Sequence, residues 1–130
     1  MLFEACLGKI HRATVTQADL DYVGSITIDR TLAEAAGIRE RQRVTITNLR
    51  SGFLWYTYVK YGAPDSGTIC LNGPPAHHFT IGDIVIILAY GLLTPQEMDG
   101  HDFPIVFVDA KNRITSVKKD SEIVPGTIDK

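Results

Sequence analysis

The alternation of apolar and polar residues predicts that most of this chain forms short β-strands. Residues 23–29 (VGSITID) place Ile26 and Ile28 on one face of an extended segment and Ser25 and Thr27 on the other, because successive side chains of a strand point to opposite faces. Similar alternation, or a composition rich in β-branched and aromatic residues, predicts further strands at residues 5–16, 43–49, 53–61, 68–71, 84–93 and 105–108.

A single helix is predicted with a clear end. It covers residues 31–36, and Gly37 follows at the position where a left-handed cap favours glycine. We expect turns at residues 50–52, 72–75, 82–83 and 109–112, and a polar turn or one helical turn within TQADLDY (residues 16–22). Many short strands, one short helix and no internal repeat favour a mainly β fold, a small closed β-barrel, because closure removes exposed strand edges.

Composition fits one globular domain. The chain has 130 residues, of which 45% are hydrophobic and 22% charged, and its net charge of −2 disfavours a nucleic acid or an anionic membrane as partner. We expect a barrel domain at residues 1–117 and a loosely ordered tail at 118–130. The apolar run at residues 84–93 is too short for a membrane-spanning helix, and charges interrupt the opening segment, so we expect a cytoplasmic protein.

No cofactor-binding motif of the usual kinds is present. Cys6 and Cys70 lie far apart without metal-ligand spacing, and the His77-His78 pair lacks carboxylate or thiolate neighbours, so we expect no metal. A nucleotide-binding barrel is disfavoured because no glycine-rich phosphate loop occurs.

The Gly24-Ser25 bond offers a different chemistry. A serine hydroxyl that attacks the preceding carbonyl converts the peptide bond into an ester, and glycine suits this step because it permits unusual backbone angles and crowds the carbonyl least. Elimination and hydrolysis would then leave a pyruvoyl group in place of Ser25. Its ketone can form a Schiff base with an amine and accept electrons from a departing carboxylate. A Gly-Ser dipeptide by itself is also common where a turn ends and a strand begins.

Several motifs in one order sharpen this prediction. They are residues 7–29 (LGKIHRATVTQADLDYVGSITID), 35–38 (AAGI), 57–59 (TYV), 71–73 (LNG) and 77–87 (HHFTIGDIVII). On these residues the chain resembles the pyruvoyl-dependent aspartate 1-decarboxylases, from about residue 7 to residue 90. The resemblance implies a six-stranded double-psi β-barrel, a homotetramer, self-cleavage into residues 1–24 and 25–130, and conversion of L-aspartate to β-alanine for pantothenate and coenzyme A supply. It also implies a covalent pyruvoyl group with neither metal nor pyridoxal phosphate.

The resemblance also implies site residues. Ser25 would be the source of the pyruvoyl group, Gly24 the other side of the cleaved bond, Thr57 an aid to ester formation and Tyr58 the proton donor to the decarboxylated carbon. The remaining positions are implied to line the substrate pocket, with Lys9 as a partner for a substrate carboxylate: Lys9, His11, Tyr22, Thr57, Asn72, Gly73, Pro74 and Pro75. Because Thr57 and Tyr58 are adjacent on a predicted strand, they should point to opposite faces.

Two departures concern the substrate pocket. Leu54 stands where the family carries an arginine that grips a substrate carboxylate, and leucine cannot replace that fork of donors. Arg50, across the predicted turn, is a candidate replacement. Pro74 and Pro75 stand where relatives have alanines, which removes backbone donors. Two alternatives stay open: a decarboxylase of the same mechanism for another amino acid, and a non-catalytic barrel subunit. The sequence also leaves open whether cleavage is spontaneous or needs a helper protein.

Overall fold

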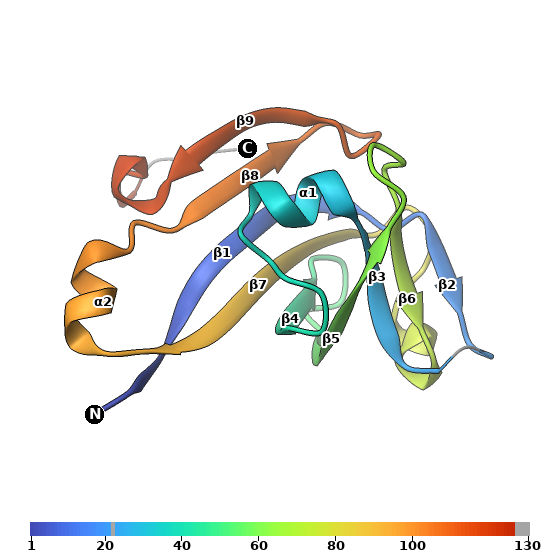
Figure 1. Cartoon of the computed structure of the whole chain (residues 1–130). Helices are drawn as coiled ribbons and strands as arrows, with labels where there is room; N and C mark the ends of the chain where they lie inside the picture. The colour runs from blue at the N-terminus through green and yellow to red at the C-terminus, as the bar shows by residue number, and fades with distance from the viewer. Residues whose placement is uncertain (22, 127–130) are drawn as a thin grey trace.

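A computed structural model shows a mainly β protein and describes residues 1–21 and 23–126 (Figure 1). This confirms the predicted fold class. The strands are β1 Phe3–Thr14, β2 Gln17–Asp19, β3 Ser25–Asp29, β4 Arg43–Asn48, β5 Leu54–Gly62, β6 Ile69–Asn72, β7 Ile84–Leu93, β8 Pro104–Val108 and β9 Ile114–Lys119. The helical segments are short: α1 Arg30–Ala35, η1 Pro74–His78, α2 Pro95–Gly100 and η2 Asp120–Glu122.

Hydrogen bonds join the strands in the order β2-β6-β3-β5-β4-β7-β1-β8-β9. The two longest strands, β1 and β7, run antiparallel across the molecule, and β3, β6 and β2 lie together at one end of it (Figure 1). The chain passes from β1 to β2 in two residues, so strands at distant places in this order are direct neighbours in sequence. The narrower expectation of a closed, six-stranded double-psi barrel stays a prediction.

The hydrophobic core forms on the inner face of the strands. Its members alternate with more exposed residues, as the period-2 pattern requires. Burying each such aliphatic side chain contributes about 1.5–3 kcal/mol before the entropy of ordering is subtracted. The following side chains of β1 and β3–β7 have no exposed surface: Ile10, Ile26, Ile28, Val44, Ile46, Val59, Ile69, Leu71, Val85 and Ile87.

Helix α1 begins and ends where local chemistry favours it. The carboxylate of Asp29 accepts a hydrogen bond from the backbone N–H of Thr31 at 2.8 Å and so caps the first turn. It also accepts from the backbone N–H groups of Asp65 and Gly67, each at 2.9 Å. Gly37 follows the helix with φ of 72°, which confirms the predicted glycine cap. The observed helix starts one residue before the predicted one.

Helix α2 and strands β2 and β9 were not predicted from the sequence. Helix α2 carries a capping box, in which the Thr94 hydroxyl accepts from the Glu97 N–H and the Glu97 carboxylate accepts from the Thr94 N–H, and this T-x-x-E signal was available. Strand β2, which was expected as a turn, is polar and exists through parallel pairing with β6. Strand β9 pairs with β8 and continues to Lys119, two residues past the predicted domain boundary at residue 117.

Within residues 1–21 and 23–126, no helix is both long enough and apolar enough to cross a bilayer.

Candidate active site

Ser25 begins β3 and is held by a residue of the neighbouring strand. Ser25 pairs with Asn72 of β6, and the Asn72 side-chain amide donates 3.0 Å hydrogen bonds to the hydroxyl oxygens of Ser25 and Thr27. The thiol of Cys70 donates to the Asn72 side-chain oxygen at 3.2 Å, and burial raises the pKa of this thiol, which keeps its proton in place. The Ser25 oxygen is therefore an acceptor in this contact, and its O–H can serve as a donor to another group.

Tyr58 lies on the same face of the sheet as Ser25. Ile26 of β3 pairs with Val59 of β5, and both side chains point into the core with no exposed surface. Ser25 and Tyr58 each precede this pair by one residue, so alternation places both on the opposite, outer face. Tyr58 in turn pairs with Arg43 of β4.

These pairings make a row of four side chains across four adjacent strands: Asn72 on β6, Ser25 on β3, Tyr58 on β5 and Arg43 on β4. We call this the outer-face row. Ser25 has no exposed surface, whereas 37% of Tyr58 is exposed. The row thus brings the predicted pyruvoyl source beside the predicted proton donor, on one face.

Thr57 faces the other way. It pairs with Val44, a core residue, so its side chain lies on the inner face, as expected for the neighbour of Tyr58. In the described part of the chain its hydroxyl makes no hydrogen bond with Ser25. The structure therefore places Thr57 one strand away from the Gly24-Ser25 bond and on the inner face, and its processing role stays a prediction.

Lys9 and His11 lie four strands from Ser25 along the sheet. Both are on β1, where Lys9 pairs with Leu88 and the His11 ring meets Phe107 edge to face at 5.3 Å. Strands β7, β4 and β5 separate β1 from β3. Four inter-strand steps amount to about 19 Å along the sheet, which is more than a lysine side chain spans. Along the sheet, therefore, neither residue is a neighbour of Ser25.

The turn after Asn72 has the geometry that only glycine adopts easily. Gly73 has φ of 91° and ψ of −168°, and its N–H donates to the Asp19 carbonyl at 2.7 Å. Pro74 and Pro75 occupy the first positions of η1. Proline is tolerated there because the first backbone N–H groups of a helix have no acceptor within it. Tyr22 lies outside the described residues, and so its predicted place in the pocket is not tested.

Gly24 does not use the special backbone freedom of glycine. It is absent from the described glycines with positive φ, and a Cβ there would meet only the Asn72 carbonyl oxygen, at 3.8 Å. The argument from unusual backbone angles is therefore not supported by this structure. Low crowding next to the carbonyl remains as the reason for glycine.

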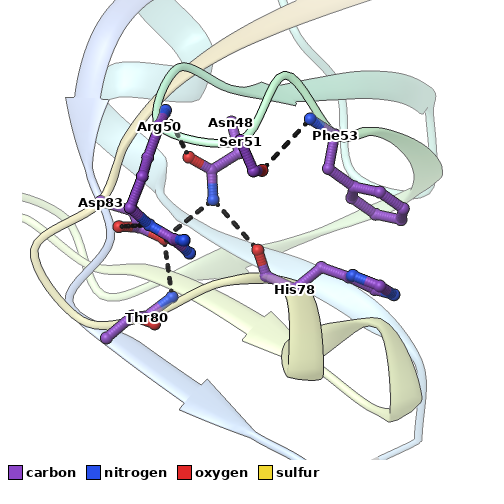
Figure 2. A network of polar contacts seen from close by, with 7 residues as sticks. All are labelled: Asn48, Arg50, Ser51, Phe53, His78, Thr80 and Asp83. Carbon is purple, nitrogen blue, oxygen red and sulfur yellow. Dashed lines mark hydrogen bonds and ion pairs between the residues drawn. The ribbon is translucent and has the colours of Figure 1, made fainter.

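Arg50 does not replace the missing arginine. Figure 2 shows its guanidinium against the carboxylate of Asp83, which it contacts through Nε and Nη2, each at 2.9 Å. Asp83 also accepts from the Asn48 amide at 2.8 Å and the Thr80 N–H at 2.8 Å. This hydrogen bonding, led by Arg50, holds the pKa of the Asp83 carboxyl well below its usual range. Arg50 therefore links the β4–β5 turn to the loop before β7, and its guanidinium is already paired with Asp83.

The same network supports the segment that follows the Asn72-Gly73 turn. Asn48 donates a second bond, 3.0 Å long, to the backbone carbonyl of His78, the last residue of η1 (Figure 2). The ring of Phe53 stacks on that of His78 with centroids 3.9 Å apart. Sequence reasoning missed this network, because its members are separated by up to 35 positions and no local motif marks them.

Residues 1–21 and 23–126 contain no cluster of three or more histidine, cysteine, aspartate or glutamate side chains suited to a metal ion. That the protein needs no metal stays a prediction.

Comparison with known proteins gives a consistent result. A family model described as aspartate decarboxylase matches residues 1–115. The chain is 52% identical to the aspartate 1-decarboxylase of Caldicellulosiruptor saccharolyticus over 122 residues, which cover 94% of this chain and 95% of that protein. It is 51% identical to the one from Ruminiclostridium cellulolyticum over 90% of this chain and 94% of that protein. It is 52% identical to the aspartate 1-decarboxylase of Lactiplantibacillus plantarum over 88% of this chain and 88% of that protein.

Proposed function

The chain belongs to the aspartate decarboxylase family, and from this premise we propose that it removes the α-carboxylate of L-aspartate, releasing CO₂ and leaving β-alanine. The identity of about half of all residues to enzymes named aspartate 1-decarboxylase, along nearly their whole length, supports this substrate. Within the structure, one observation carries the proposal: the Ser25 hydroxyl, directly after Gly24, is buried and oriented by Asn72.

The chain's own residues can make the reactive group. The Ser25 oxygen attacks the Gly24 carbonyl carbon, the peptide C–N bond breaks, and the serine nitrogen takes the proton, so an ester replaces the amide. Loss of the Ser25 α-proton then expels residues 1–24 as a carboxylate and leaves a dehydroalanine. Water then adds to this group, the nitrogen leaves as ammonia, and a ketone remains at the start of residues 25–130. The balance needs no oxidant or metal.

The buried hydroxyl fits this role chemically. Asn72 holds the oxygen in place, and the Gly24 side of the bond is uncrowded. Once formed, the ketone would supply an acceptor for the electron pair that the departing carboxylate releases. Tyr58, on the same face and partly open to solvent, would protonate the carbon that has lost CO₂.

Cleavage would also give substrate access. Ser25 has no exposed surface in the intact chain, whereas Val23 is 75% exposed. Breaking the bond after Gly24 releases a free chain end that can move away from position 25. Maturation would then create the reactive group and uncover it in one event.

The assembly and location are further parts of this proposal. Because β1 lies four strands from β3 along the sheet, we propose that Lys9 and His11 contribute from another copy of the chain, which the predicted homotetramer would supply. We place the enzyme in the cytoplasm, and its cleavage is either spontaneous or assisted by a helper protein.

One observation favours a second candidate, a decarboxylase of the same mechanism for another amino acid. Leu54 is apolar and 56% exposed, and Arg50, the expected substitute, is held by Asp83. If neither residue 54 nor Arg50 offers a cation to the substrate, the pocket loses one means of distinguishing a dicarboxylic substrate from a neutral one.

The test is denaturing mass spectrometry followed by CO₂ release from a panel of amino acids. We expect two fragments, residues 1–24 and 25–130, and turnover of aspartate above all others. The Ser25→Ala variant should stay as one chain and be inactive. Turnover of a different amino acid would favour the second candidate, and an unbroken, inactive wild-type chain would favour a non-catalytic subunit.

A further inference from the structure

We propose that Arg43 binds the side-chain carboxylate of the substrate. It would thereby replace the family's arginine, which is leucine at position 54 of this chain. This inference rests on the proposed function, because only an acidic substrate brings a second carboxylate to the site. Nothing in the sequence singled out Arg43, which is one of 13 lysine and arginine residues.

The position of Arg43 in the sheet is the first argument. Arg43 pairs with Tyr58, and side chains directly opposite in an antiparallel pair lie on the same face with Cβ atoms about 5 Å apart. Arg43 is therefore the fourth member of the outer-face row, next to the predicted proton donor and two strands from Ser25.

The state of its guanidinium is the second argument. It lies over the ring of Tyr56, 4.3 Å from the ring centroid. Tyr56 is between Leu54 and Tyr58 on the outer side of β5, so the aromatic ring holds the charge over the strip of sheet that includes Leu54. Within the described residues this guanidinium makes no salt bridge, so its forked donors are available to a carboxylate.

Geometry allows this contact within one chain. Two inter-strand steps separate β4 from β3, about 10 Å. From ordinary bond lengths, an extended arginine side chain spans roughly 7 Å and an aspartate molecule roughly 5 Å. Their sum covers the gap between Arg43 and a substrate held at position 25.

The two cations that the sequence analysis considered are less suited. Both oxygens of Asp83 already occupy the Arg50 fork. Lys9 is on β1, four strand steps from β3. In the proposed reaction Lys9 of another copy would therefore remain free for the α-carboxylate, while Arg43 selects the side chain.

The experiment compares the wild type with Arg43→Met and with Arg39→Met, a matched variant of another exposed arginine that lies outside the outer-face row. Each protein is first checked for its two fragments by mass. The rate of CO₂ release from aspartate is then measured over a range of concentrations. Inhibition is measured with succinate, which has two carboxylates, and with propionate, which has one.

Arg43→Met should mature normally and lose roughly 30-fold or more in kcat/KM for aspartate, mainly through KM, since this carboxylate does not change during the reaction. Its inhibition constant for succinate should rise by a similar factor, while that for propionate changes less than about threefold. Arg39→Met should match the wild type. If Arg43→Met does not split, Arg43→Gln replaces it, with the same expectation.

Two results would overturn the assignment of Arg43. A mature variant with wild-type KM for aspartate and wild-type inhibition by succinate would overturn it alone and leave the proposed function standing. A wild-type protein that splits but releases no CO₂ from aspartate would overturn the proposed substrate, and the role of Arg43 with it.

Discussion

The side-chain amide of Asn72 donates to the Ser25 hydroxyl at 3.0 Å, although the two residues are 47 positions apart. The same amide bridges to Thr27, and its oxygen accepts from Cys70, so the amide cannot rotate without losing three contacts. Ser25 is thus presented to the preceding bond by a rigid partner on the neighbouring strand. Asn72 is a positioning residue for the proposed self-cleavage.

Replacing Asn72 by alanine should slow cleavage by roughly tenfold, because one orienting hydrogen bond contributes about 1–1.5 kcal/mol. A time course of denaturing mass spectra on freshly made protein measures the loss of the full-length chain. Thr27→Val is the matched control: it removes the other bond of the amide and leaves the bond to Ser25. Cleavage of Asn72→Ala at the wild-type rate would remove Asn72 from the processing step.

Replacing Tyr58 by phenylalanine should separate maturation from turnover. The ring and its packing are kept, so we expect two fragments at the normal rate. Without the hydroxyl, kcat for CO₂ release should fall about 10²- to 10⁴-fold, the usual contribution of a positioned acid. Tyr90→Phe, on β7, is the control and should behave as the wild type. A Tyr58→Phe enzyme with unchanged kcat would show that another group supplies the proton.

Replacing Asp83 by asparagine should destabilise the fold by about 2–3 kcal/mol, because the new amide faces donors of Arg50, Asn48 and Thr80. Arg50→Met should have a smaller effect, about 0.5–1 kcal/mol, because the Arg50 side chain is 58% exposed. Urea unfolding at neutral pH compares the two. Equal losses would mean that the ion pair, rather than the whole network, accounts for the contribution of Asp83.

The Asp83 contribution should also depend on pH. Its hydrogen bonds, first of all that from Arg50, hold the pKa of this carboxyl below the unfolded-state value of roughly 4. A depressed folded-state pKa stabilises the fold above the unfolded-state value, and this contribution declines as the pH falls below it. The difference in unfolding free energy between wild type and Asp83→Asn should therefore be constant above about pH 5 and shrink toward pH 3. A pH-independent difference would contradict the assigned cause.

Replacing Gly73 by alanine should cost about 1–3 kcal/mol, since its φ of 91° with ψ of −168° lies in a region that essentially only glycine occupies. Gly52→Ala, in an open turn with φ of 73°, should cost about 1 kcal/mol. Because Gly73 directly follows Asn72, its variant should also cleave more slowly, whereas the Gly52 variant should not. Thermal unfolding and the mass time course measure both effects, and similar behaviour of the two variants would refute the special role of this turn.

Local signals predicted the parts of the fold whose causes lie within a few residues. Gly37 marks the end of α1, and alternation marks β3, β4 and β5, because caps and side-chain period act between near neighbours. Strands β2 and β9 escaped prediction because their residues are mostly polar, and pairing with β6 and β8 makes them strands. Pairing between distant segments leaves no local pattern in the sequence.

The amino-acid sequence by itself determined the chemistry that is available and the family: a serine after a glycine, a Thr57-Tyr58 pair, an Asn72-Gly73 turn, and leucine at position 54. Only the tertiary structure decided which of these groups meet. Strand register sets Asn72 against Ser25 and Arg43 against Tyr58, turns Thr57 inward, keeps Lys9 on a distant strand and commits Arg50 to Asp83. The physical reason is that side-chain type is written in each residue, while contacts follow from backbone hydrogen bonds between segments tens of residues apart.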